Sequence, residues 1–216
     1  MKIAIALFDR FTALDAVGPY EVLSRLPGAE VVFVAAEKRI YRTDIGALAL
    51  LPGATFAEVD RADILLVPGG PGRQAMMADE ALVGWVRKIH PTTQWTTSVC
   101  TGSLVLGAAG VLQGIDAVTH WGAMTDLAAV GANPVSERVV IRGKIVTAAG
   151  VSAGIDMALT LAARIAGEDV ARAIQLGIEY DPQPPFDSGH PSKATPETVQ
   201  VIAELMRQTE QAHAAA

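Results

Sequence analysis

Residues 96–110 read TTSVCTGSLVLGAAG and join a β-branched strand directly to a helical segment. The junction lies at Cys100 and Thr101, and Gly102 allows the backbone to turn sharply there. The pattern predicts a cysteine side chain presented at the end of a strand and at the start of a helix. The positive end of the helix dipole lowers the pKa of a thiol, and the Thr101 amide at the helix start is placed to donate to an anionic oxygen.

The order of strand followed by helix repeats on both sides of this junction. Short apolar runs, which predict strands, alternate with longer helical patterns. This alternation predicts an α/β fold in which helices cover both faces of a mostly parallel sheet. Arg142-Gly143 marks the turn of a small β-hairpin. The predicted strands are 2–8, 30–36, 64–67, 95–99, 137–141 and 144–148; the predicted helices are one ending near residue 26, 73–89, 101–109, 120–130, 152–166 and 168–180.

The composition of the sequence changes after Tyr180, where prolines become frequent. Residues 181–191 read DPQPPFDSGHP, which cannot form a regular helix or an inner strand. We therefore expect an extended arm on a surface, followed by a final helix over residues 195–211. The chain divides into a domain at 1–180 and an arm with a C-terminal helix at 181–216, which packs on the same domain or on a dimer partner.

Composition excludes several classes of function. The net charge is −6 and no cluster of Lys or Arg follows the chain, so nucleic acid is not an expected partner. No apolar run is long enough to span a membrane, and the first residues lack a signal-peptide cleavage site, so we expect a cytoplasmic protein. With one cysteine in 216 residues, neither an internal disulfide nor a cysteine-based metal site is expected.

A second junction, Gly150-Val151-Ser152-Ala153-Gly154, fits the G-x-S-x-G elbow of serine hydrolases. The histidine that follows it, His190, lies in the proline-rich arm, where no regular element would aim it. The simpler interpretation is favoured, in which Ser152 caps the next helix and the glycines permit close packing. His90 and His120 lie at predicted helix ends and are interpreted as structural residues.

Two further features complete a site around Cys100. The loop Pro68-Gly69-Gly70-Pro71-Gly72 follows a buried strand, and the Gly70 amide can face the thiol if the two strands are parallel neighbours. Asp15 follows the first strand among apolar neighbours, which would raise its pKa and keep a proton available near neutrality. Asp15 as a simple helix cap is the alternative interpretation.

Four segments together resemble the ThiJ/PfpI superfamily: VPGGPG at 67–72, SVCTGSLVLGAAG at 98–110, THW at 119–121 and GVSAGIDMAL at 150–159. The resemblance covers the whole chain. It implies a flavodoxin-like three-layer sandwich and a homodimer. It also implies Cys100 as the nucleophile, the amides of Gly70 and Thr101 as oxyanion donors, and neither metal nor organic cofactor.

The sequence departs from the best-known members of this superfamily. Protease-like and deglycase-like members have a histidine directly after the cysteine, where this chain has Thr101, and a glutamate where it has Asp15. The histidine–glutamate pair of glutamine amidotransferases is also missing, since His190 is followed by Pro191-Ser192.

Cys100-Thr101-Gly102 together with Asp15 instead resembles the isonitrile hydratase-like members. That resemblance implies a lyase that hydrates a small isocyanide, R–NC, to an N-substituted formamide. Cys100 would form a thioimidate, Asp15 would act as general acid and base, and the Thr101 hydroxyl would position substrate or water.

Two alternatives remain open. Related domains serve as the small-molecule sensor of AraC-type regulators, but here a single helix that is not basic follows the arm. The other alternative is a different cysteine hydrolase of the same superfamily.

Overall fold

A seven-stranded sheet forms the centre of the computed structural model, which describes residues 1–214. The strand order is β10-β11-β7-β6-β1-β2-β5, and every neighbouring pair is parallel except β10 and β11. The strands are β1 (Lys2–Ala6), β2 (Glu30–Ala35), β5 (Ala54–Thr55), β6 (Ile64–Val67), β7 (Trp95–Val99), β10 (Val139–Arg142) and β11 (Ile145–Ala148). The predicted mostly parallel sheet and its hairpin are confirmed.

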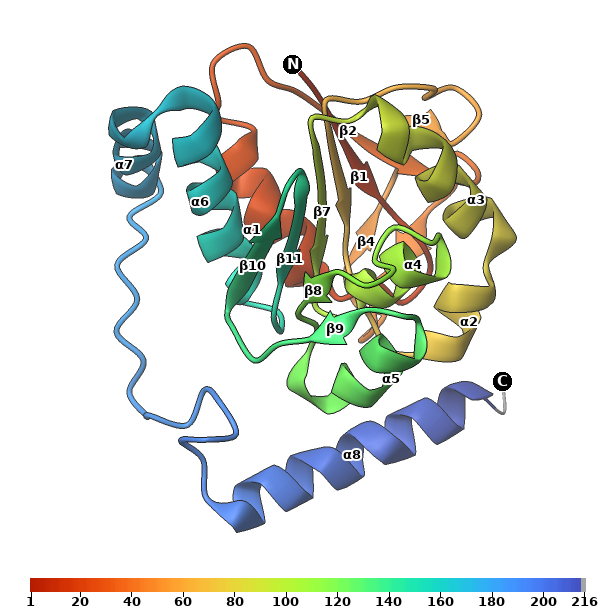
Figure 1. Ribbon diagram of the computed structural model, residues 1–216, viewed down its shortest axis with the longest axis vertical. Coiled ribbons are helices and arrows are strands. Elements are labelled where there is room, and N and C mark those ends of the chain that lie inside the picture. The colour runs from red at the N-terminus through yellow and green to blue at the C-terminus, as the bar shows by residue number, and fades with distance from the viewer. Residues whose placement is uncertain (215–216) are drawn as a thin grey trace.

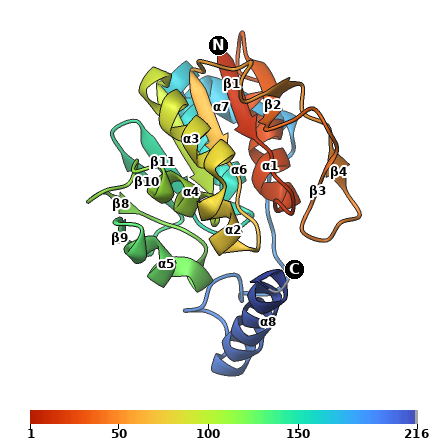
Figure 2. The same cartoon turned by 90° about the vertical axis from the view of Figure 1, so that its right-hand side faces the viewer.

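Helices cover both faces of this sheet, as Figures 1 and 2 show from two sides. The inner strands are therefore apolar along their whole length: all four residues of β6, Ile-Leu-Leu-Val, are buried. One face carries α1 (Ala13–Leu23), α6 (Ala153–Ala166) and α7 (Glu168–Gly177); the other carries α2 (Arg73–Ala78), α3 (Glu80–Ile89), α4 (Gly102–Ala108) and α5 (Met124–Ala129). This is the predicted flavodoxin-like three-layer sandwich.

Two predicted helices are interrupted, each by a capping side chain. The predicted helix 73–89 divides into α2 and α3 because the Asp79 carboxylate accepts hydrogen bonds from the amides of Ala81 and Leu82 and starts a new helix. The predicted helix 120–130 begins as the 3-10 turn η2 (Trp121–Ala123), where His120 Nδ1 accepts from the Gly122 amide, and continues as α5.

Several two-residue strands and one further turn were not predicted, because segments this short carry no periodic pattern. β3 (Tyr41–Arg42) and β4 (Ala49–Leu50) form a small antiparallel pair. β8 (Asp116–Ala117) pairs with β9 (Asn133–Pro134) beside the sheet, and the 3-10 turn η1 (His90–Thr92) follows α3.

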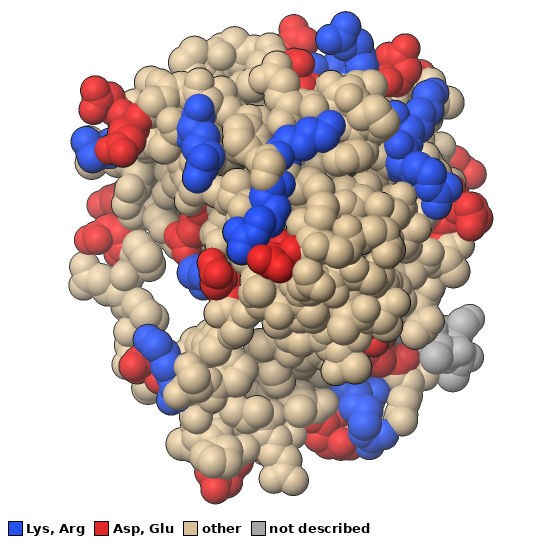
Figure 3. All heavy atoms as spheres, viewed as in Figure 1, with Lys and Arg blue, Asp and Glu red and all other residues tan. Residues whose placement is uncertain are grey.

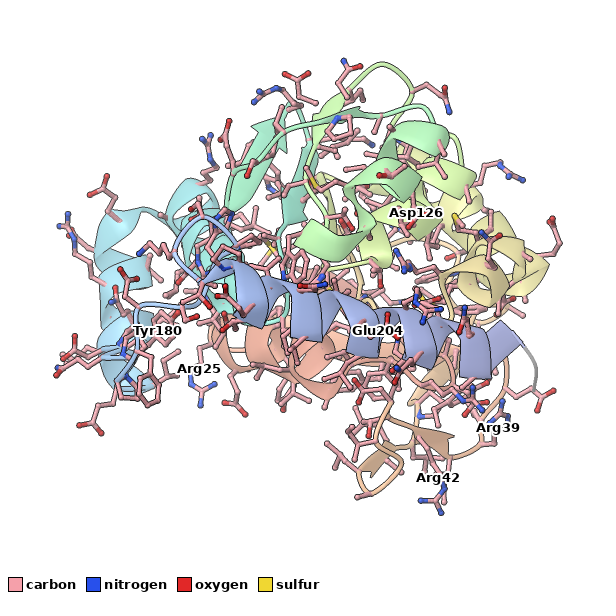
Figure 4. The ribbon with its side chains drawn as sticks, turned by 90° about the horizontal axis from the view of Figure 1, so that it is seen from below. Arg25, Arg39, Arg42, Asp126, Tyr180 and Glu204 are labelled. Carbon is pink, nitrogen blue, oxygen red and sulfur yellow. The ribbon has the colours of Figure 1, made fainter. Side chains whose placement is uncertain are left out.

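The C-terminal segment leaves the body after α7 as an extended arm and returns as α8 (Pro196–Ala214). Seen from below, α8 crosses the molecule, with Tyr180 on one side of it and Asp126 on the other (Figure 4). The last two residues of the predicted segment 181–216 lie outside the described residues. Among residues 1–214, no helix combines the length and the apolar character needed to cross a membrane.

The strand register brings three sequence-distant segments to one edge of the sheet. β6 and β7 are parallel neighbours with Val67 opposite Ser98, so the loop after β6 lies beside Cys100. β1 pairs with the other side of β6, and the chain continues from its end into α1, which carries Asp15. The parallel pairing that the sequence required for Gly70 to approach Cys100 is therefore present.

Gly102 is expected to be intolerant of a side chain. A Cβ at this position would overlap the carbonyl oxygen of Val67, which is fixed in β6. We expect Gly102→Ala to lower the free energy of unfolding by about 2–3 kcal/mol, measured by urea denaturation. Gly84→Ala is the matched control, because a Cβ there meets no atom within 4 Å and Ala favours α3 by up to about 1 kcal/mol. Equal stability of the two variants would contradict this account.

Candidate active site

Cys100 has a left-handed backbone, with φ of 57°, which is uncommon for a residue with a side chain. Its N–H donates to the carbonyl oxygens of Ala148 (3.1 Å) and Ala149 (2.9 Å). Its C=O accepts from the hydroxyls of Thr119 (3.0 Å) and Ser103 (3.2 Å). Residues from β11, α4 and the loop before η2 thus hold Cys100 in a conformation that costs energy by itself.

Asp15 lies in the first turn of α1 and is completely buried. Its Oδ2 accepts a hydrogen bond of 2.9 Å from the Gly69 amide, whereas Oδ1 has no hydrogen-bond partner among the described residues. Burial raises the pKa of Asp15 to about 7, and the hydrogen bonds from Gly69 and Cys100 only partly oppose this rise. The carboxyl can therefore both give and accept a proton near neutral pH, as the apolar neighbours of Asp15 predicted.

The Cys100 thiol lies beside this carboxyl and is also enclosed, since the residue is only 6% exposed. Burial raises the pKa of the thiol, and the negative charge of Asp15 raises it further. The amides of Val151 and Thr101 lower the thiol pKa, but their effect is smaller than that of burial. The amide at the helix start therefore lowers the thiol pKa in the predicted direction, but burial has the larger effect and the net shift of the thiol pKa is upward. The favoured resting state keeps the thiol protonated.

Gly70 and Thr101 are hydrogen-bonded to each other beside the sulfur. The Gly70 amide donates to Thr101 Oγ1 (2.9 Å), and the same hydroxyl donates to the Gly70 carbonyl (2.8 Å). This pair of bonds joins the loop after β6 to the cysteine elbow, but it occupies the Gly70 N–H. The roles predicted for Gly70 as an oxyanion donor and for the Thr101 hydroxyl in positioning substrate stay predictions, and each would require this pair of bonds to open. Both the amide and the side chain of Thr101 act on the sulfur, since hydrogen bonds from each lower the thiol pKa.

Gly69 is the residue that sequence reasoning missed. Its amide is the donor to Asp15, and a Cβ at this position would clash with Thr101 and approach Asp15 Oδ2 at 3.0 Å. A glycine is required because three segments meet here at backbone distance. The glycine-rich loop at residues 69–72 indicated a close backbone approach, but from the sequence we assigned that approach to Gly70 rather than to Gly69.

Residues 1–164 match the DJ-1/PfpI family. The chain belongs to the DJ-1/PfpI family. It is 45% identical over 194 residues to an isonitrile hydratase of Pseudomonas putida, covering 90% of this chain and 85% of the relative. A crystal structure of a ThiJ/PfpI family protein from Pseudomonas syringae superposes on this chain with a TM-score of 0.93 at 35% sequence identity. The superposition covers 99% of this chain and 89% of the Pseudomonas syringae chain.

A regulator is also similar to this DJ-1/PfpI chain. A helix-turn-helix transcriptional regulator of Pseudomonas aeruginosa is 28% identical over 190 residues, which cover 83% of this chain and 51% of the regulator. The chain thus spans about half the length of this relative.

The second elbow of this DJ-1/PfpI chain has a structural role. Ser152 precedes α6 but makes no capping hydrogen bond; its hydroxyl instead accepts from Arg138 (3.3 Å), which corrects the expected cap. Arg138 also pairs with Asp156. His190 contacts the hydroxyl of Ser192 (2.7 Å) rather than Ser152, so no Ser–His pair forms here.

His120 and His90 do not form part of the pair of Asp15 and Cys100. Burial lowers the pKa of His120, and the positive charge of Arg73 lowers it further. His90 Nδ1 contacts Thr96 Oγ1 at 2.8 Å, at the opposite end of β7 from Cys100. Within residues 1–214, no three His, Cys, Asp or Glu side chains are grouped so that they could hold a metal ion.

The burial of Asp15 predicts a pH-dependent stability difference. Its pKa rises from an ordinary 3.8 to about 7 on folding, so the stability that depends on a neutral carboxyl is present below pH 4 and is lost as pH rises through 7. Asp15→Asn stays neutral. We expect its stability relative to wild type to increase from pH 4 to pH 8 by up to about 4 kcal/mol.

Urea denaturation at both pH values measures this difference, with the exposed Asp60→Asn as the control. A stability difference for Asp15→Asn that is the same at pH 4 and pH 8 would show that the native carboxyl is not held neutral.

Proposed function

We propose that this protein is an isonitrile hydratase, which adds water to an isocyanide R–NC and releases the formamide R–NH–CHO. One observation carries the proposal: a buried carboxyl whose pKa is raised to about 7 lies beside a buried thiol at a strained elbow. The 45% identity to the Pseudomonas putida enzyme over most of both chains supports it. The reaction needs water and one proton that moves between the reacting groups. The Cys100–Asp15 pair can carry this proton.

In the first step Cys100 and Asp15 add a thiol across the isocyanide carbon. The thiol proton passes to Asp15, whose Oδ1 has no other hydrogen-bond partner among the described residues. Asp15 then delivers this proton to the lone pair of the isocyanide carbon, while a sulfur lone pair forms the C–S bond. One C–N π bond becomes the nitrogen lone pair. The result is a thioimidate, R–N=CH–S, on Cys100.

In the second step water replaces the sulfur. Asp15 accepts a proton from the attacking water as the C–O bond forms and passes this proton to the nitrogen, which gives the tetrahedral adduct R–NH–CH(OH)–S and leaves Asp15 as a carboxylate. When the carbonyl forms, the C–S bond breaks and the hydroxyl proton returns to the sulfur through Asp15. The cycle ends with R–NH–CHO, a neutral thiol and the original protonation of the pair.

Backbone amides are proposed to stabilise the charge on sulfur during both steps. Those of Thr101 and Val151 lower the thiol pKa, which means that they favour its anionic form. Gly69 and the Gly70–Thr101 hydrogen-bond pair fix the carboxyl and the elbow relative to each other. In this mechanism the Thr101 hydroxyl orients the elbow rather than the substrate.

A non-catalytic sensor domain is the second candidate, supported by the similarity to the Pseudomonas aeruginosa regulator. A closed thiol with a raised pKa reacts slowly with alkylating agents in an enzyme and in a sensor alike, so reactivity does not distinguish them. Turnover of an isocyanide does distinguish them.

We also propose that the protein acts as a cytoplasmic homodimer, with residues 1–180 as the catalytic domain and 181–216 as an appended arm and helix. The exposed apolar side chains of α8 support a partner for that helix: Val201, Ile202 and Leu205 are all at least 40% exposed. The molar mass in solution, measured by light scattering, tests the dimer.

Replacing the nucleophile or the acid should remove turnover. We expect Cys100→Ala to reduce formation of N-cyclohexylformamide from cyclohexyl isocyanide to the uncatalysed rate. Asp15→Asn should lower kcat by roughly 10²–10⁴-fold, because it can neither take the thiol proton nor deliver it. Chromatographic measurement of the formamide gives both rates. Ser152→Ala should retain most of the activity, and a fully active Cys100→Ala would exclude the mechanism.

The pH dependence of kcat/KM should follow the titration of the Cys100–Asp15 pair. The reactive pair holds one proton, and this state is reached when the first of its two protons leaves, at about pH 7. We expect kcat/KM to fall roughly tenfold for each pH unit below 7 and to level off above it. A profile that is flat from pH 5 to pH 8, or that declines above pH 7, would contradict the proposal that ionised Asp15 accepts the thiol proton.

A further inference from the structure

The C-terminal strap, residues 181–214, is attached to the body near both of its ends. At its start the Tyr180 hydroxyl donates to Asp156 (2.8 Å). Near its end the Glu210 carboxylate accepts from the amides of Gly72 and Arg73, both at 3.2 Å, and pairs with the Arg73 guanidinium. The strap therefore crosses below the edge of the sheet that carries Cys100 (Figures 1 and 4).

A cavity of about 650 Å³ lies between this strap and the body. Its volume falls within the range typical of small-molecule sites. Apolar side chains line it from both sides: Trp121, Met124 and Val151 from the body, and Pro184 and Phe186 from the strap. The space-filling view shows an opening between the arm and the body (Figure 3).

The wall of this cavity is the backbone that holds the nucleophile. Thr119 donates to the Cys100 carbonyl, Ala149 accepts from the Cys100 amide, and the Val151 amide lowers the thiol pKa. All three residues line the cavity. Cys100 and Asp15 do not themselves line the cavity, so a substrate held here needs a narrow reactive group that extends past this wall, and an isocyano group is narrow and linear with its reactive carbon at the tip.

Two of the cationic residues at the cavity have acidic partners, whereas Glu137, which also lines it, has no ion pair among the described residues. Arg138 pairs with Asp156, and Lys193 pairs with Asp187 at 2.7 Å. An anionic substituent would have to break such a pair or remain uncompensated near Glu137, whereas an apolar one replaces water against aromatic surface. Phe186 is 79% exposed and would bury apolar surface in such a contact.

We propose that this cavity binds the organic substituent of the isocyanide, and that the enzyme prefers apolar substituents with a ring. Phe186 is the specificity-determining residue that the strap contributes. This inference rests on the proposed function. It assigns a role to a segment that follows the part of the chain matching the family, residues 1–164.

The test compares kcat/KM for benzyl isocyanide with kcat/KM for methyl isocyanide. We expect wild type to favour the benzyl compound at least tenfold, and Phe186→Ala to lower this ratio about tenfold, mainly through KM. Leu176→Ala is the matched control: Leu176 is similarly exposed, on α7, and does not line the cavity. The ratio should not change in this variant.

A second measurement does not depend on turnover. N-benzylformamide should bind to Cys100→Ala more tightly than N-methylformamide, by calorimetry, and the preference should be lost when Phe186→Ala is added. Turnover of both isocyanides with an unchanged ratio in Phe186→Ala would overturn the role of the cavity and leave the proposed function standing. No turnover of either isocyanide by wild type would overturn both.

Discussion

The left-handed backbone at Cys100 is the constraint around which the site is built. A residue with a side chain adopts this conformation only when its surroundings compensate the cost. Here the compensation comes from the hydrogen bonds of its own N–H and C=O to Ala148, Ala149, Thr119 and Ser103. Because these partners come from three different elements, the position of the sulfur is set by the packing of the whole carboxyl edge of the sheet.

The same edge also sets the electrostatics of the site. Asp15 approaches from α1, and Gly69 lets the loop after β6 pass between Asp15 and Thr101. Removing both the thiol and the carboxyl from water raises the pKa of each, so the pair binds protons strongly at neutral pH. A neutral substrate that needs both a nucleophile and a proton at one carbon is suited to such an arrangement, since no separate acid is required.

The sequence predicted the parts of this site that follow from pattern. Apolar runs placed β6 and β7, and the turn after Cys100 followed from Gly102. The apolar neighbours of Asp15 predicted the direction of its pKa shift correctly. The roles of Gly69 and Gly70 were not predictable, because two adjacent glycines look alike until the register decides which amide meets which oxygen. The direction of the thiol pKa depended on how completely other segments enclose it, which no local pattern encodes.

The strap is attached to the body by Tyr180 and Glu210, and neither of these residues contacts Cys100 or Asp15 in the hydrogen bonds described above. Under the proposed function, the reacting residues and Phe186, the strap residue proposed to set specificity, thus occupy separate lengths of polypeptide. Natural variation in residues 181–214 can then retune which molecules are accepted while leaving bond making and breaking intact. Relatives with the same cysteine elbow and a different C-terminal segment are accordingly expected to catalyse the same reaction on different substrates.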